Sequence, residues 1–367
     1  MATHLPSRQR RLAAVATLAA LGVLVGACGK SGSSSTSTTA PGTTAVKLAA
    51  ATLNGSGSSF QKAFDDEAIT EFVAEHSGVT VNYAGGGSGK GLTDLKGKLV
   101  DFAGSDAPIA AADIANYGGA GAVLYFPTVV GPITVSYNLS GVSKLTLSGP
   151  TIAKIFAGKI TTWNDPAIAA DNPGATLPAT KVTPVHRSDS SGTTRNFTLY
   201  LTKVDPTDWT YGTGTTVSWP GGATGNTNTG VAQTIKAADG SIGYVDFSDA
   251  KASSLTFASV INSSGKTVAP TLAAASAAAA SATVNADLTY DPTNAPGADT
   301  YPITSPTWVL VYKAQTDKAK GTALKAFLSF VLTTGQTDVA GKTDFAPLAG
   351  DLLTKAKAQL DQIVIPA

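Results

Sequence analysis

Apolar residues recur at helical spacing in three separate stretches of the chain, and glycine and hydroxyl residues precede each stretch. Steps of three and four residues place apolar side chains on one face of a helix. The first turn of a helix has backbone N–H groups without intrahelical partners, so each helix start is a candidate anion site. The three apolar faces consist of Phe60, Phe64, Ala68 and Phe72; of Leu92, Leu95 and Leu99; and of Phe197, Tyr200 and Leu201.

Other apolar segments predict strands and further helices between and after these three helices. We expect the strongly apolar residues 122–137 to cross between two lobes, and residues 205–230 to form a long surface loop. Alternating strands and helices predict an α/β architecture with mostly parallel sheets. The other expected strands lie at 79–83, 100–105, 241–247 and 301–312, and the other expected helices at 150–156, 270–282 and 322–331.

The first 28 residues have the composition of an export signal. Three arginines precede an apolar run over residues 12–25, which is shorter than the ~20 residues that a transmembrane helix needs. Small residues stand directly before Cys28, the only cysteine, and this pattern resembles the lipobox of bacterial lipoproteins. We therefore expect residues 1–27 to be a lipoprotein signal peptide and Cys28 to be lipidated. A plain signal peptide with a chance cysteine is the alternative.

Residues 28–45 are rich in serine, threonine and glycine and cannot bury a core, so we expect a flexible tether there. It would connect the outer side of the cell membrane to a globular body that starts near residue 46. The chain of 367 residues is long enough for two domains. Its net charge of +1 gives no electrostatic footprint for nucleic acid, so a charged ligand must be held by local groups.

Two charged side chains lie near the predicted helix starts. Arg187, a few residues before Ser191, offers a forked and permanently charged donor that fits phosphate or carboxylate oxygens. Asp106 follows a predicted strand, at the edge where ligands lie in open α/β sheets. A carboxylate beside anion-binding groups is favourable only if the ligand carries a proton that it can donate. A surface arginine and an ordinary turn aspartate are the simpler alternatives.

Two enzyme-like motifs fail on inspection. The run Gly85–Gly91 lacks the nucleotide-binding pattern, because Ala84 stands where that motif needs glycine and its lysine is followed by glycine. His186, Asp189 and Ser191 are residue types of a catalytic triad, but they lie within six residues on one short loop. No His, Cys or carboxylate cluster has metal-ligand spacing. We therefore expect no enzyme activity, in particular no phosphatase, and no metal or cofactor.

Three motifs, taken together, resemble the ligand loops of a known family. Their order and spacing are similar to those of the phosphate-binding proteins that serve ABC-type phosphate transporters. With supporting stretches, the resemblance covers nearly all of residues 52–350. The motifs are Gly55-Ser-Gly-Ser-Ser-Phe60, Gly85-Gly-Gly-Ser88 followed by Asp101-Phe-Ala-Gly-Ser-Asp106, and Arg187-Ser-Asp-Ser-Ser-Gly-Thr193.

The resemblance implies a two-lobed periplasmic-binding-protein-like fold of type II, with phosphate bound in the cleft between the lobes. Residues 46–130 plus 300–367 would form lobe 1, and residues 131–299 would form lobe 2. The lobes would close on the ligand, and the chain would deliver it to the ABC permease and ATPase subunits of the transporter. The resemblance implies no cofactor, no metal and no nucleic-acid partner.

The resemblance also implies a role for each site residue. Asp189 would orient Arg187, Asp106 would accept a proton from the ligand, and Phe60 would donate through its backbone N–H. The phosphate-binding residues would be Ser59, Phe60, Ser88, Asp106, Arg187, Ser191, Gly192 and Thr193.

Two positions depart from the family pattern. His186 stands where the family often has a second arginine, and Ser190 stands where it has glycine. Both positions lie beside the expected contacts, so they bear on affinity more than on ligand identity. Two alternatives stay open on other grounds: a binding protein for another oxyanion such as sulfate or molybdate, and a lipoprotein receptor or adhesin that kept the fold. Asp106 argues against a fully deprotonated anion, since two acceptors would then face each other.

Overall fold

The computed structural model describes residues 48–367. The predicted signal peptide, the lipidated Cys28 and the predicted tether lie outside these residues. Among residues 48–367, no helix is both long enough and apolar enough to cross a membrane.

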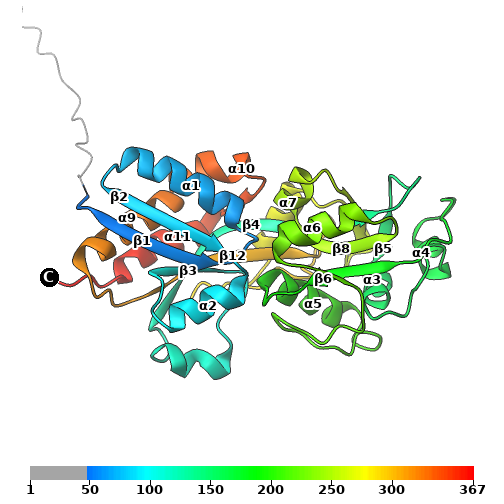
Figure 1. Cartoon of the computed structure of the whole chain (residues 1–367), viewed down its shortest axis with the longest axis horizontal. Helices are drawn as coiled ribbons and strands as arrows, with labels where there is room; N and C mark the ends of the chain where they lie inside the picture. Colours follow the sequence, from blue (N-terminus) through cyan, green and yellow to red (C-terminus); the bar gives the residue numbers. More distant parts are fainter. Residues whose placement is uncertain (1–47) are drawn as a thin grey trace, which may run out of the picture. The chain divides into compact units, whose positions relative to one another are not determined.

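One mixed sheet runs through the described part of the chain (Figure 1). Two short strands, β9 (Thr256–Phe257) and β13 (Ala346–Pro347), also pair with its strand β4. A separate small sheet contains β11 (Thr267–Val268), β10 (Ser259–Ile261) and β5 (Thr146–Ser148). The strand order of the large sheet is β2 (Val79–Gly85), β1 (Ala51–Gly57), β3 (Phe102–Ser105), β12 (Thr304–Tyr312), β4 (Val123–Asn138), β8 (Ser241–Asp246), β6 (Thr183–Arg187) and β7 (Ala223–Gly225).

The two outer parts of this sheet are parallel, and its middle is antiparallel. β1 is parallel to β2 and β3, and β6 is parallel to β7 and β8. In the middle, β12 and β4 run antiparallel to each other and to their neighbours. The predicted predominance of parallel pairs is therefore wrong in the middle. The physical reason is that the chain leaves the first part along β4 and returns along β12, and an apolar pattern carries no information on strand direction.

β4 is shared by the two parts of the sheet. Its first half pairs with β12 as far as Pro132, and its second half pairs with β8 from Ile133 onward. We call residues 48–132 with 304–367 the first lobe, and residues 133–303 the second lobe. The predicted strand at 122–137 is confirmed. The domain bounds at residues 130 and 300 stay a prediction.

The helices agree with most of the sequence-based predictions. The exceptions are Phe60, which precedes α1, Leu99, which lies beyond the end of its helix and is 72% exposed, and the predicted loop 205–230, which ends in β7 and a helix start. Short helical turns lie at η1 (Ala111–Tyr117), η2 (Gly335–Val339) and η3 (Leu360–Gln362). The helices are α1 (Lys62–Glu75), α2 (Ser88–Lys96), α3 (Gly149–Phe156), α4 (Pro166–Asp171), α5 (Gly192–Val204), α6 (Thr227–Ala237), α7 (Phe247–Ala252), α8 (Leu272–Ala280), α9 (Lys318–Val331), α10 (Ala340–Lys342) and α11 (Gly350–Gln359).

Connection handedness places α1 and α2 on opposite sides of the first part of the sheet (Figure 1). The chain passes from β1 through α1 to β2 on one side of β1, and then through α2 back to β3 on the other side. Right-handed crossovers in opposite directions put their helices on opposite faces. α1 then packs against α9, where the Phe72 ring lies 5.3 Å from Phe327 and 5.7 Å from Phe330, measured between ring centroids.

We expect Phe72→Ala to lower the free energy of unfolding by about 3–5 kcal/mol, because Phe72 is fully buried in this cluster and its removal leaves a cavity. Urea denaturation measures the change. The matched control is Leu99→Ala, which removes an exposed side chain and should change the free energy by less than about 0.5 kcal/mol. Equal effects of the two substitutions would contradict the packing described here.

Candidate functional site

Three helix starts meet where the two lobes face each other, and each follows the end of a parallel strand. α1 follows β1, α2 follows β2 and α5 follows β6. Ligands in open α/β sheets lie at this edge. Gly87, directly before α2, has a φ of 91°, which favours glycine. Ser191 caps α5, and its hydroxyl accepts a hydrogen bond from the backbone N–H of Thr194 (3.2 Å).

Hydrogen bonds between the lobes bring four of the predicted site residues together. The backbone N–H of Gly192 in the second lobe donates to Ser88 Oγ in the first lobe (3.1 Å). The backbone N–H of Asn228 donates to Ser59 Oγ (3.2 Å). The side-chain amide of Asn228 also donates to Ser59 Oγ and to Thr193 Oγ1, each at 3.2 Å. Residues far apart in the sequence thus form one buried polar cluster.

Asp106 lies at the centre of this cluster, directly after β3, and is 1% exposed. Its Oδ1 atom accepts hydrogen bonds from Ser58 Oγ (2.6 Å) and Thr307 Oγ1 (2.7 Å). Its Oδ2 atom has only a long contact with Ser88 Oγ (3.4 Å). A Cβ atom added to Gly192 would lie 2.7 Å from Asp106 Cβ, so only glycine allows this approach of the second lobe.

Opposing effects set the pKa of the buried Asp106 carboxyl group. Burial raises its pKa from 3.8 to about 6. The hydroxyls of Ser58 and Thr307 and the nearby Arg187 guanidinium act in the opposite direction, since each favours the carboxylate. Near neutral pH, the group is therefore a buried carboxylate with one oxygen atom, Oδ2, still able to accept a strong hydrogen bond.

Arg187 is buried at the end of β6, 4% exposed. Its guanidinium donates from Nε and Nη2 to the two carboxylate oxygens of Asp189, the contact that the family resemblance implies. Asp189 also accepts from the backbone N–H of Thr227 (3.1 Å). Within residues 48–367, Nη1 of Arg187 is buried and has no hydrogen-bond partner. A permanently charged donor without an acceptor is suited to an anionic ligand.

The backbone N–H of Phe60 has a different partner from the one that the resemblance implies. It donates to Ser58 Oγ (3.0 Å), and the Phe60 ring packs against Phe345 with 5.5 Å between ring centroids. Donation from this N–H to a ligand stays a prediction.

Sequence reasoning missed three residues of the cluster: Ser58, Thr307 and Asn228. Ser58 directly precedes a predicted site residue, so the hydroxyl run at the first helix start was an available signal. Thr307 lies where the pairing of β12 with β4 shifts register, and such bulges often re-aim side chains at functional sites. Asn228 lies in the first turn of α6, within the segment that was predicted to be a loop.

The triad residue types do not form a catalytic triad. Asp189 is bonded to Arg187, and Ser191 caps α5. The His186 ring stacks on Trp219 with 4.7 Å between centroids, and burial lowers the pKa of His186. Among residues 48–367, no group of three or more His, Cys, Asp or Glu side chains could hold a metal ion.

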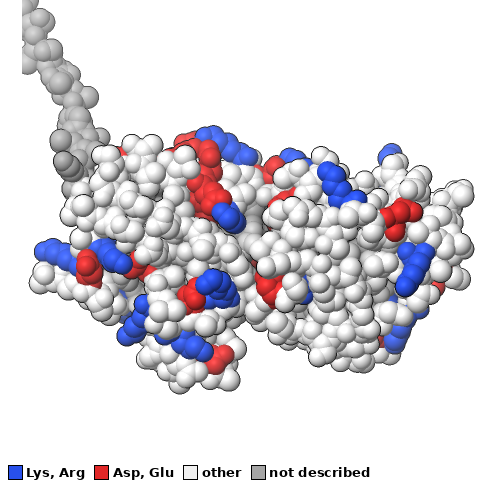
Figure 2. Space-filling view, viewed as in Figure 1, with Lys and Arg blue, Asp and Glu red and all other residues white. Residues whose placement is uncertain are grey.

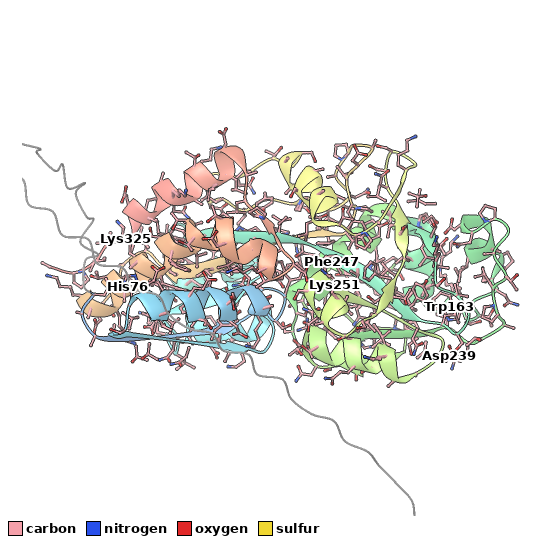
Figure 3. All side chains as sticks on the ribbon, turned by 90° about the horizontal axis from the view of Figure 1, so that it is seen from above. His76, Trp163, Asp239, Phe247, Lys251 and Lys325 are labelled. Atoms are coloured by element: carbon pink, nitrogen blue, oxygen red, sulfur yellow. The ribbon has the colours of Figure 1, made fainter. Side chains whose placement is uncertain are left out.

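The polar cluster borders a surface hollow between the lobes at Ser59. A hollow of about 370 Å³ is lined there by Ser59 and Lys62 from the first lobe and by Thr227 from the second. A further contact between the lobes is the ion pair of Lys251 on α7, labelled in Figure 3, with Asp344 of the first lobe (2.5 Å). Figure 2 shows charged side chains in small groups of mixed sign on the face drawn there. The electrostatic field at the site is therefore provided by the site's own charged groups.

Sequence comparisons find a family for this arrangement. A family model described as "PBP superfamily domain" matches residues 34–334. The phosphate-binding protein PstS of Xylella fastidiosa is 36% identical over 315 residues, which cover 83% of this chain and 84% of that protein. The phosphate-binding protein PstS 3 of Mycobacterium tuberculosis is 35% identical over 324 residues, which cover 85% of this chain and 86% of that protein.

Solved structures share the fold. PfluDING, a high affinity periplasmic phosphate-binding protein bound with phosphate, superposes with a TM-score of 0.70 at 22% identity, over 84% of this chain and 94% of that one. The phosphate binding protein of Stenotrophomonas maltophilia superposes with a TM-score of 0.65 at 21% identity, over 84% of this chain and 94% of that one. The predicted type II fold is confirmed, and these relatives are binding proteins, not enzymes. The chain belongs to the PstS family of phosphate-binding proteins within the PBP superfamily.

Proposed function

We propose that this chain binds inorganic phosphate in a protonated form, in the cleft between its lobes. The observation that carries the proposal is a pair of buried groups: the partnerless Nη1 atom of Arg187 and the incompletely bonded Oδ2 atom of Asp106. A cation beside a carboxylate matches an anion that still carries an O–H group. Phosphate at neutral pH has both properties, whereas sulfate has no proton to donate.

The proposed roles follow from the donors that surround these two groups. Ser88 accepts hydrogen bonds from Gly192 N and Asp106 N, and its own hydroxyl hydrogen makes only the long contact with Asp106 Oδ2, so it can turn toward a ligand. Asp189 orients the Arg187 guanidinium, as their paired contacts indicate. The remaining proposed donors are Ser59, Phe60 through its backbone N–H, and the start of α5 at Ser191, Gly192 and Thr193.

Selectivity against sulfate is assigned to Asp106. A buried carboxylate that faces a sulfate oxygen leaves two acceptors opposed, and each unsatisfied group costs free energy. Sites built to use a ligand hydroxyl can reject an analogue without it by ~10⁴ to 10⁵. The same argument disfavours molybdate as the ligand.

We further propose that the protein works outside the cytoplasm, is anchored to the cell membrane through Cys28, and delivers phosphate to the permease and ATPase of an ABC transporter. The support is the signal-like N-terminal sequence, the resemblance to transporter-associated phosphate-binding proteins, and the relatives named PstS. A closed pair of lobes around the ligand gives a permease one surface that differs from the open form.

The direct test is to purify the protein, denature it and measure the phosphate that is released. The proposal predicts about one phosphate per chain after purification in phosphate-free buffer, or one-to-one rebinding once ligand has been stripped by unfolding and refolding. Release of sulfate or molybdate instead would support the binding of another oxyanion. Binding of no anion would support the receptor or adhesin alternative.

We expect wild-type affinity for sulfate to rise as the pH falls from about 8 to about 5. Below its pKa of about 6, Asp106 gains a proton and changes from an acceptor into a donor for a sulfate oxygen. Asp106→Asn has a donor at every pH, so it should bind sulfate with little pH dependence. Calorimetric titrations measure both proteins. A flat wild-type profile would remove Asp106 from the selectivity mechanism.

Arg187→Ala should weaken phosphate binding by about 2–5 kcal/mol, because a buried anion would lose its charged partner. Arg187→Lys keeps the charge but loses the planar fork, so a smaller but measurable loss is expected. Calorimetry gives both affinities. Unchanged affinity in the alanine variant would place the bound anion elsewhere.

Gly89→Leu should hold the lobes apart and increase the radius of gyration measured by small-angle X-ray scattering. The backbone N–H of Gly89 donates to Ser190 O (3.0 Å), and a side chain at this position would overlap Ser190 of the other lobe. Thr93→Leu, an exposed position on the same helix, is the matched control and should scatter like the wild type. Phosphate affinity should fall only in the glycine variant.

A further inference from the structure

A chain of polar side chains runs from Asp106 away from the cleft to a second carboxyl group, that of Asp65 on α1. Asp106 Oδ1 lies 2.7 Å from Thr307 Oγ1, and this hydroxyl also contacts the Gln61 side-chain amide. The Gln61 carbonyl oxygen faces Thr307, and its amide nitrogen lies 2.8 Å from Asp65 Oδ2. All four residues are at most 1% exposed. The two carboxyl groups are thus joined by three consecutive buried contacts.

The three contacts need three hydrogens, one more than Gln61 and Thr307 supply between them. A glutamine amide donates at its nitrogen end and accepts at its oxygen end, and a threonine hydroxyl carries one hydrogen. Gln61 and Thr307 therefore contribute two hydrogens to three contacts. The third must come from a protonated carboxyl group at one end, Asp65 or Asp106. Otherwise one buried contact would join two acceptors, which is unfavourable.

The position of this proton sets the direction of the whole chain. With the proton on Asp65, its O–H donates to the Gln61 carbonyl, the Gln61 amide nitrogen donates to Thr307, and Thr307 donates to an ionised Asp106. With the proton on Asp106, all three bonds reverse. As placed, the Gln61 nitrogen faces Asp65 and the oxygen faces Thr307, which is the second direction. The two ends of the amide are nearly identical in shape, so turning the amide over gives the first direction in the same space.

The surroundings of Asp65 favour the protonated form there. Lys62 is paired with Asp66 on the exposed side of α1, and Tyr83 of β2 donates its hydroxyl hydrogen to Ser58 O (2.8 Å). Asp65 Oδ1 is buried and has no partner among residues 48–367, an arrangement that costs less for a neutral acid than for a carboxylate. Burial raises the pKa of Asp65 well above its ordinary value.

Of the two carboxyl groups, Asp106 is the one that ionises more readily. Its carboxyl group has hydroxyl donors in Ser58 and Thr307 and the positive charge of Arg187 nearby, whereas Asp65 has neither hydroxyl donors nor a cation in contact. Asp65 and Asp106 face each other across the chain, and ionising one disfavours ionising the other. Two further acidic groups lie nearby: Asp66 next to Asp65, and the buried Asp246 of the second lobe, which interacts with Asp106.

We propose that Asp65 is a positioning residue that carries a proton and thereby holds Asp106 as a carboxylate with Oδ2 free for the ligand. With the Gln61 amide turned over, the proton on Asp65 makes Thr307 a donor to Asp106 Oδ1. This oxygen atom is then fully bonded to two hydroxyls, and the ligand proton has one acceptor left. The inference deepens the proposed function and rests on it for its effect on ligand choice.

The location of the proton is tested on the ligand-free protein by infrared difference spectroscopy at about pH 8, where Asp106 is ionised. The wild type minus Asp65→Asn spectrum should contain the C=O band of a protonated carboxylic acid. Asp66→Asn, the exposed neighbour on the same helix, should give no such band. If the Asp65 difference shows only carboxylate bands, the proposal is overturned. This result does not depend on phosphate binding.

The positioning role is tested by two variants of Asp65 that differ in hydrogen bonding. The asparagine of Asp65→Asn can still donate to the Gln61 carbonyl, so it should keep the wild-type preference for phosphate over sulfate and its pH profile. Asp65→Ala cannot donate, so Thr307 can turn toward Gln61 and away from Asp106. We expect the preference to fall about tenfold or more, the worth of one hydrogen bond to a charged group.

The pH dependence separates this role from a purely structural one. In Asp65→Ala, the loss of a donor raises the pKa of Asp106, so the rise in sulfate affinity should begin at a higher pH than in the wild type. Equal profiles for the alanine and asparagine variants, with both folded as judged by circular dichroism, would overturn the positioning role. If the wild type itself binds no phosphate, the proposed function fails, and the infrared result still decides where the proton lies.

Discussion

The burial of the Asp106 carboxyl group near the Arg187 guanidinium is the constraint on which the rest of the site depends. An isolated charge is expensive to remove from water, and a buried carboxylate is tolerated only with donors and a nearby cation. Hydroxyls of Ser58 and Thr307 satisfy one of its oxygen atoms. The second oxygen atom and the third nitrogen of Arg187 are then the groups that a protonated anion would complete in the proposed function.

The two lobes hold the two halves of this charge arrangement. The first lobe positions Asp106 after β3, and the second positions Arg187 at the end of β6. Gly192, at the start of α5, lets the second lobe approach Asp106 because it has no side chain. Ligand binding and lobe closure are therefore expected to be coupled, since the complementary charges face one ligand only when the lobes meet. β4 and β12 connect the two halves.

The sequence predicts the helices and the charged residues of the candidate site, but not the hydrogen bonds that other segments make to these residues. Apolar spacing places the starts of α1, α2 and α5, and the three motifs identify Arg187 and Asp106. Thr307 could not be predicted, because it contacts Asp106 from 201 positions away, at a register shift that no local pattern encodes. The direction of β4 and β12 and the role of Asn228 likewise depend on tertiary pairing. Leu99 shows that spacing alone does not fix a helix end.

The most direct test of the account is a calorimetric comparison of phosphate and sulfate on the stripped wild-type protein at about pH 8, where Asp106 is a carboxylate. The account predicts tight one-to-one binding of phosphate and no measurable heat from sulfate at the same concentrations. Binding of both anions with similar affinity would contradict it, because a buried carboxylate facing the ligand would then impose no requirement for a proton.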